Sequence, residues 1–136
     1  MKPLGSWLPR WRRGLTVALA VLWAMAFVAT HIPAGRMPST HVSDRVLHVI
    51  GFGGLSTALG VAMLAHRLGR ARRALLGLAV LATYAAFDEL TQPLVARTAS
   101  AYDWLANLAG AVLGLAGVEL AGWLTSAEAA SRPPAK

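Results

Sequence analysis

Three pairs of polar side chains in the 136-residue chain have the spacing of one helical turn. They are Asp44 with His48, Glu89 with Gln92, and Asp103 with Asn107. At separations of three or four residues, both members of a pair share one face of a helix. A histidine beside carboxylates could act as a general acid or base. The carboxylates could orient it, activate a hydroxyl, or hold a divalent cation together with it.

These patterns give two sets of candidate site residues. The candidate catalytic residues are His48, Glu89, Asp103 and Asp44, and the candidate substrate-binding residues are Arg97, Arg45, Gln92, Asn107 and Ser100. The two arginines suit a phosphate or carboxylate, because a guanidinium group is permanently charged and fork-shaped. Ser100 could also serve as a nucleophile. The pattern leaves open whether a metal is bound, since one histidine among carboxylates suits a hydrogen-bonded cluster equally well.

The composition predicts that these residues are carried by a membrane protein. Hydrophobic residues make up 56% of the chain and charged residues only 14%, more apolar surface than one small water-soluble core can bury. The absence of cysteine excludes disulfides, thiol catalysis and cysteine-based metal sites. The net charge of +7 does not indicate nucleic-acid binding, because the basic residues lie in clusters beside apolar runs.

Four apolar runs are long enough, or nearly so, to cross a bilayer as helices, which needs about 20 residues. They are residues 14–30, 44–65, 74–92 and 103–124. We therefore expect an all-α integral membrane four-helix bundle over residues 14–124. Residues 1–13 read as a basic interfacial segment, and residues 125–136 as a disordered tail. The first run is the shortest, and with Ala24-Met25-Ala26 it could instead belong to a cleaved signal peptide.

The distribution of lysine and arginine predicts the orientation. Ten of the thirteen fall in the N-terminal segment, the 66–73 loop and the C-terminal tail, and three fall on the other side. The positive-inside rule then places both termini in the cytoplasm. In this topology the second and fourth helices begin at the outer face and the third ends there. The three polar pairs are thus expected to line one outward-facing pocket.

Each feature also has a purely structural interpretation. His48 could be a partnered histidine inside the bundle, and Asp103 could cap the fourth helix. Arg45 and Arg97 could extend to lipid headgroups, and Glu119 to cytoplasmic water. Two pairs of small residues predict close helix packing, namely Gly110 with Gly114 and Ser56 with Gly60. A functional site is favoured because the polar groups share one depth, whereas groups that only hold helices together would be scattered.

The order of these residues resembles that of the VanZ-like family, small bacterial membrane proteins named for a determinant of low-level teicoplanin resistance. The resemblance covers about residues 44 to 115. Its motifs are Asp44-Arg45-Val46-Leu47-His48, then Glu89-Leu90-Thr91-Gln92, and then Arg97 followed by Asp103 and Asn107-Leu108-Ala109-Gly110. Two departures are Arg45, where the family usually has lysine, and Val95-Ala96, where it commonly has Pro-Gly.

The resemblance implies a multi-pass protein of the bacterial inner membrane with a role in the cell envelope, and glycopeptide tolerance in some members. We expect the pocket to bind, and it could also modify, an anionic envelope molecule such as a lipid headgroup or a lipid-linked glycan. The alternative is a scaffold or sensor whose polar layer only fixes helix packing. A proton-coupled carrier is disfavoured, because Ser56 and Thr57 are the main polar groups near the bilayer midplane. Substrate identity, cofactors, enzymatic activity and oligomeric state are left open.

Overall fold

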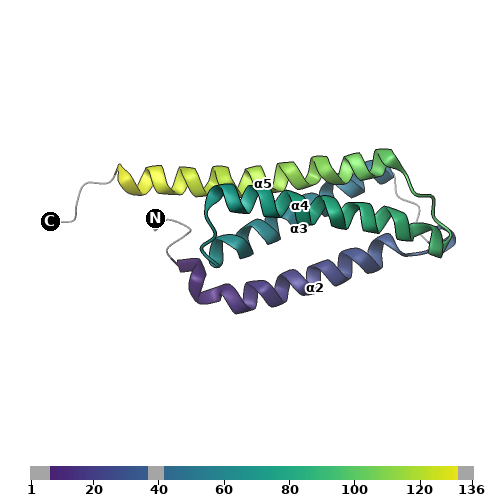
Figure 1. Ribbon diagram of the computed structural model, residues 1–136, viewed down its shortest axis with the longest axis horizontal. Coiled ribbons are helices and arrows are strands. Elements are labelled where there is room, and N and C mark those ends of the chain that lie inside the picture. Colours follow the sequence, from purple (N-terminus) through teal and green to yellow (C-terminus); the bar gives the residue numbers. More distant parts are fainter. Residues whose placement is uncertain (1–6, 37–41, 132–136) are drawn as a thin grey trace.

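The computed structural model describes residues 7–36 and 42–131. Four long helices, each long and apolar enough to cross a membrane, make up almost all of this part of the chain. They are α2 (Arg12–Thr30), α3 (Asp44–Ala65), α4 (Arg70–Thr91) and α5 (Ala101–Ala130), with short 3-10 helices η1 (Leu8–Trp11), η2 (Ala34–Arg36) and η3 (Gln92–Val95). The prediction of an all-α four-helix membrane bundle is confirmed. In Figure 1, α2 begins and α5 ends at the same end of the bundle.

The closest helix pair is α3 with α5, and glycines allow this contact. A β-carbon on Gly110 would overlap the carbonyl oxygen of Val49 and lie 2.9 Å from the amide nitrogen of Gly53. A β-carbon on Gly114 would overlap the hydroxyl of Ser56, which donates a hydrogen bond to the Gly110 carbonyl at 3.3 Å. Small residues let the two backbones approach, and van der Waals packing then holds them. The packing role predicted for Gly110 and Gly114 is confirmed.

The remaining core lies around this pair. On α3, a β-carbon on Gly60 would lie 3.2 Å from Val118 of α5, so Gly60 also packs as predicted. On α4, Gly77 packs against Leu115 of α5 in the same way. The buried hydrophobic core is formed by Phe52, Leu55, Leu59, Leu81, Ala85, Ala111 and Leu115. All of these residues come from α3, α4 and α5.

Helix α2 lies at the edge of the bundle. It has no fully buried residue, although Leu19, Trp23 and Ala26 pack partly against the core. The ring of Trp23 meets that of Tyr84 edge-on at 5.0 Å. In Figure 1, α2 runs alongside the other three helices as a separate rod. Side chains of α2, α3 and α4 line a cavity beside this helix.

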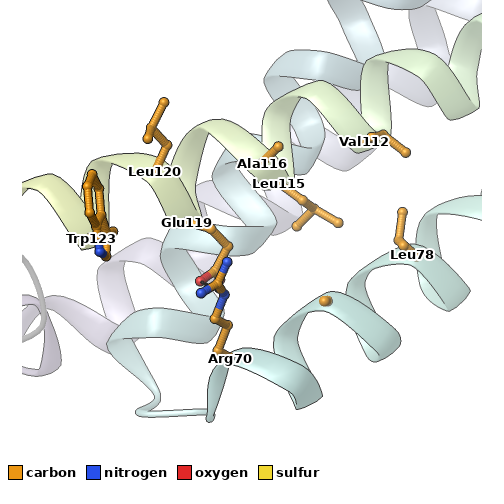
Figure 2. A pocket seen from close by; sticks show the side chains of 9 residues that line it. Arg70, Leu78, Val112, Leu115, Ala116, Glu119, Leu120 and Trp123 are labelled. Carbon is orange, nitrogen blue, oxygen red and sulfur yellow. Dashed lines mark ion pairs between the residues drawn. The ribbon is translucent and has the colours of Figure 1, made fainter.

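Helix α4 begins earlier than the sequence predicts. The basic residues from Arg70 to Arg73 form its first turn, whereas residues 66–73 were expected to be a loop. Arg73 binds Glu119 of α5 through two hydrogen bonds of 2.8 Å. Arg70 lies 3.6 Å from the same carboxylate, and Figure 2 shows these two side chains together. Glu119 was expected to reach cytoplasmic water, but it is paired across α4 and α5. The ion pair explains how arginines are accommodated at a helix N-terminus, where the helix dipole disfavours positive charge.

Helix α5 continues to Ala130, past the boundary at Leu124 that the sequence indicates. Residues 127–130 are three alanines and one glutamate, which are strong helix formers. The predicted boundary was based on hydrophobicity, which does not measure helix propensity. The described part of the N-terminal basic segment is also helical, and Leu8 of η1 is buried at α3. Residues 1–6 and 132–136 of the two expected terminal segments lie outside the described residues.

Candidate functional site

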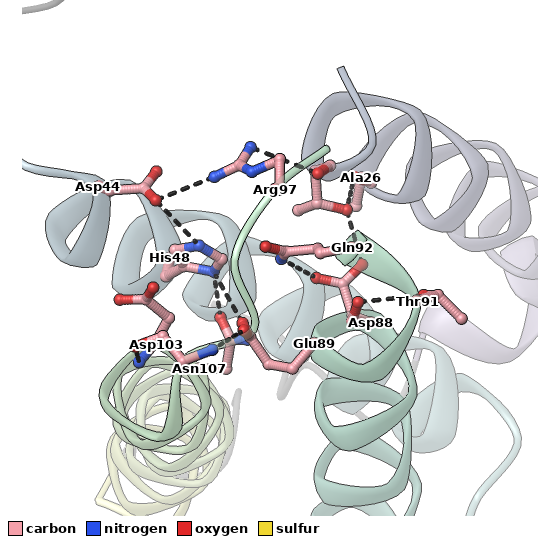
Figure 3. A network of polar contacts seen from close by, with 12 residues as sticks. Ala26, Asp44, His48, Asp88, Glu89, Thr91, Gln92, Arg97, Asp103 and Asn107 are labelled. Atoms are coloured by element: carbon pink, nitrogen blue, oxygen red, sulfur yellow. Dashed lines mark hydrogen bonds and ion pairs between the residues drawn. The ribbon is translucent and has the colours of Figure 1, made fainter. Parts of the chain in front are cut away.

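Polar side chains gather at the end of the bundle where α3 and α5 begin and where α2 and α4 end (Figure 3). We call this group the outer polar cluster, because the orientation predicted from the sequence would place this end of the bundle at the outer face. Its members are Thr30, His31, Asp44, His48, Asp88, Glu89, Thr91, Gln92, Arg97, Ser100, Asp103 and Asn107. All four long helices and the segment between α4 and α5 contribute to it. The cluster faces inward, as polar groups at membrane depth must when no water is near.

A hydrogen-bonded chain joins α3, α5 and α4 at the centre of the cluster. Nδ1 of His48 lies 2.9 Å from Oδ1 of Asn107, and Nδ2 of Asn107 donates to Oε1 of Glu89 at 3.5 Å. Oε2 of Glu89 accepts from the backbone N–H of Ser100 at 3.0 Å. A carboxylate can only accept, so the Asn107 amide nitrogen must face Glu89 and its oxygen must face His48. His48 therefore donates from Nδ1, and in its neutral form it presents a lone pair on Nε2.

Arg97 connects the segment after η3 to two helices. Its Nη2 donates to Oδ2 of Asp44 at 2.9 Å, and its Nη1 donates to the carbonyl oxygen of Thr30 at 3.3 Å. The Arg97 side chain is only 10% exposed, whereas that of Asp44 is 46% exposed. The same Asp44 oxygen lies 3.8 Å from Nε2 of His48. Asp44, His48 and Arg97 thus meet at the rim of the bundle.

A second half of the cluster fastens α2 to α4. The hydroxyl of Thr30 donates to the fully buried carboxylate of Asp88 at 2.6 Å, and Gln92 donates to the other oxygen of that carboxylate at 3.4 Å. His31 lies 2.9 Å from the Thr91 hydroxyl through Nε2 and 3.7 Å from Asp88 through Nδ1. These contacts hold the C-terminal end of α2 to α4, in addition to the stacking of Phe27 on Phe87.

Thr30, His31 and Asp88 belong to the cluster but were not predicted as members of the site. A signal for them existed, because the predicted topology also places the end of the first crossing at the outer face. The argument from common depth that selected His48 and Glu89 therefore applies to His31 as well. Asp88 stands four residues before Gln92, so the spacing of one helical turn would have included it.

The structure brings most of the predicted site residues together. His48, Glu89, Asn107, Asp44, Arg97 and Asp103 form one contiguous group, and Gln92 lies in the half beside α2. Ser100 contributes its backbone N–H, while its hydroxyl caps α5 by accepting from the N–H of Asp103 at 3.3 Å. Arg45 lies outside the group, with its guanidinium 5.0 Å from the ring centre of Tyr102 on the exposed side.

A cavity of about 330 Å³ opens beside the cluster, between α2, α3 and α4. Asp44, His48 and Arg97 line its polar end. Its walls are mostly apolar and include Ala26, Ala29, Leu47, Gly51 and Phe52. Phe52 lies two helical turns below Asp44, about 12 Å along α3. The cavity is therefore charged at one end, which we call its mouth, and mostly apolar over the rest of its wall.

A larger groove of about 530 Å³ lies between α4 and α5 toward the other end (Figure 2). Leu78, Val112, Leu115 and Trp123 line it, and its charged lining residues are Arg70 and Glu119, which pair with each other. It offers no group for acid or base chemistry that is not already in an ion pair. The smaller cavity at the outer polar cluster is therefore the candidate site.

The chemistry available in the candidate site follows from its charges and lone pairs. Arg97 can bind an anion at the mouth, and Nε2 of His48 can accept a proton or bind a cation. One ligand atom each from Asp44, His48 and Asp103 lie within 4.8 Å of one another, so these three residues could hold a metal ion. Comparisons of the chain with protein-family models, with curated proteins and with solved structures give no match.

Proposed function

We propose that this chain is a VanZ-like protein of the bacterial inner membrane that binds an anionic amphiphile of the cell envelope. The amphiphile is either a membrane lipid with an anionic headgroup or a lipid-linked glycan, and both have an apolar tail. The observation that carries the proposal is the cavity, in which Asp44, His48 and Arg97 lie at one end of an apolar passage between α2 and α3. A polar headgroup matches the mouth and an acyl or isoprenoid chain matches the interior.

Arg97 is the residue that selects for an anion in this proposal. Its guanidinium is permanently charged and mostly buried, and it uses Asp44 and the Thr30 carbonyl as partners. The carboxylate of Asp44 is nearly half exposed and can turn toward water when a ligand phosphate or carboxylate takes its place. Such an exchange replaces one charge-assisted pair with another.

The backbone between α4 and α5 supports the resemblance to the VanZ-like family. Ala96, at the position where the family commonly has glycine, has φ 57° and ψ 34°. This left-handed conformation is the one that glycine adopts without steric cost. Alanine at residue 96 therefore adds a methyl group but keeps the left-handed turn that glycine favours. A link to glycopeptide tolerance rests on the family resemblance alone.

The decisive experiment blocks the cavity without disturbing the bundle. A β-carbon on Gly51 would meet nothing within 4 Å, and Gly51 lines the cavity, so Gly51→Leu fills the passage. Gly54 lies three residues further along α3, is equally open and does not line the cavity, so Gly54→Leu is the matched control. Lipids that co-purify with each variant in mild detergent are measured by mass spectrometry.

We expect the wild-type chain and Gly54→Leu to retain one class of anionic amphiphile above its level in the bulk membrane. Gly51→Leu should lose at least about 90% of this enrichment, equivalent to a tenfold loss of affinity or about 1.4 kcal/mol. The proposal is wrong if the wild-type chain enriches no amphiphile, or if Gly51→Leu retains as much as Gly54→Leu. Equal helix content and elution volume of the two variants exclude misfolding as the cause.

One observation favours a second candidate function, a scaffold or sensor in which the polar layer only fixes helix packing. The buried polar groups His48, Asp88, Glu89, Gln92 and Asn107 all have partners inside the bundle. Gly51→Leu also separates the two functions, because it fills the cavity and leaves the partners of Glu89 in place. A scaffold keeps its envelope phenotype in this variant at unchanged membrane levels, whereas a protein that acts by binding an amphiphile in the cavity loses it.

A further inference from the structure

We infer that Asp44, His48 and Asp103 form a binding site for one divalent transition-metal cation at the mouth of the cavity. The inference goes beyond amphiphile binding and does not depend on it. The three side chains come from the beginnings of α3 and α5, and one ligand atom from each lies within 4.8 Å of the others. Figure 3 shows the carboxylates of Asp44 and Asp103 on the same side of the His48 ring.

The position and hydrogen bonding of His48 support a metal site. Its side chain is only 4% exposed, and its Nδ1–H is bound to Asn107, so the ring cannot turn freely. Nε2 makes no hydrogen bond within residues 7–36 and 42–131, and its nearest charged oxygen, on Asp44, is 3.8 Å away. A metal-binding histidine has this arrangement, with one nitrogen fixed by a hydrogen bond and the other presenting its lone pair.

The carboxylate of Asp103 also supports a metal site. Each other carboxylate of the cluster has a partner: Asp44 has Arg97, Asp88 has Thr30 and Gln92, and Glu89 has Ser100. In the described part of the chain, the Asp103 side chain has neither a hydrogen bond nor an ion pair. A half-buried carboxylate next to a second carboxylate and a histidine lone pair is an unfavourable arrangement that a cation would relieve.

The geometry needs only a small adjustment to close on an ion. Ligand atoms in neighbouring positions around a metal lie about 3–3.5 Å apart when each bond is about 2.0–2.2 Å long. Nε2 of His48 and Oδ2 of Asp44 are 3.8 Å apart, which is close to this range. The side chain of Asp44 is 46% exposed and can move the remaining distance. Arg97, which donates to the Asp44 carboxylate, would act as the outer partner that orients this ligand.

The ligand set indicates the class of cation. One imidazole nitrogen with two carboxylate oxygens suits Mn²⁺ or Zn²⁺, whereas Ca²⁺ takes six to eight oxygen ligands. Three protein ligands leave further coordination positions open. Because Asp44 and His48 also line the cavity, an open position would face its interior, where a phosphate could complete the coordination.

The test measures metal binding by the full chain, purified in detergent through a tag without histidine. After treatment with a chelator, the protein is dialysed against Mn²⁺ or Zn²⁺, and the metal bound per chain is determined by mass spectrometry. Electron paramagnetic resonance of bound Mn²⁺ then reports whether nitrogen coordinates the ion. Asp103→Asn and Asp44→Asn remove one ligand charge each. His66→Gln and Glu128→Gln, exposed residues at the opposite end, are the matched controls.

We expect one ion per chain in the wild type and both controls, with nitrogen coupling that His48→Gln abolishes. Asp103→Asn should weaken binding at least about tenfold. If Asp103→Asn does not fold, Asp44→Asn carries the same prediction, because its side chain is the most exposed of the three. Failure of the wild type to bind either ion, equal affinity in the ligand variants and the controls, or absence of nitrogen coupling would each overturn the inference.

Discussion

At the scale of single residues, Asn107 decides how the candidate site works. It is fully buried. Its amide nitrogen donates a hydrogen bond to Glu89, and its amide oxygen accepts one from His48. This fixes the proton of His48 on Nδ1 and directs Nε2 to Asp44. The spacing of Asp44 and His48 in the sequence predicted that they share a helix face. It could not show that Asn107 orients the ring, because that contact joins residues 59 positions apart.

The strained turn at Ala96 gives a residue-scale prediction. Alanine in the left-handed region is less stable than glycine by about 1–2 kcal/mol, and glycine loses about 0.5–1 kcal/mol through its freer unfolded state. Ala96→Gly should therefore raise the free energy of unfolding by up to about 1 kcal/mol, measured by thermal unfolding in detergent. Ala101→Gly at the start of α5 is the control and should lower it. If Ala96→Gly lowered the free energy of unfolding, the left-handed conformation of Ala96 would not be a source of strain.

At the scale of elements, the contact between α3 and α5 positions the cluster, because it sets the distance between His48 and Asn107. Hydropathy predicted both helices, and the Gly110–Gly114 spacing predicted their contact. Other boundaries were missed for a physical reason. Arginine lowers the mean hydropathy of residues 70–73 although it is a good helix former, so the beginning of α4 was read as loop.

Gly110→Ala tests the α3–α5 contact. A methyl group there would overlap the carbonyl of Val49, and helices in close contact cannot separate without loss of packing. We expect Gly110→Ala to reduce the free energy of unfolding by about 1–3 kcal/mol, measured by denaturant titration. Gly117→Ala on the same helix meets nothing within 4 Å and should leave stability unchanged or slightly raised. Equal effects of the two substitutions would contradict the close contact.

At the scale of the whole molecule, the two ends of the bundle carry different groups of polar residues. One end carries the ion pair of Arg73 with Glu119, and the other carries the outer polar cluster and the cavity. The number of helices and the common depth of the cluster could be predicted from hydropathy and charge. The cavity could not be predicted, because it depends on how α2 packs against α3 and α4. Since α2 has no fully buried residue, its sequence does not show which of its faces makes this contact.

We propose that the outer polar cluster opens on the extracytoplasmic face of the membrane, and the proposed function depends on this orientation. Because the chain has no cysteine, single cysteines can be introduced and labelled in intact cells with a maleimide that does not cross membranes. Leu94, 83% exposed and next to the cluster, and Ser126, exposed near the end of α5, mark the two ends of the bundle. We predict that Leu94→Cys is labelled in intact cells and Ser126→Cys only after permeabilisation. Labelling of Ser126→Cys but not Leu94→Cys in intact cells would contradict the account.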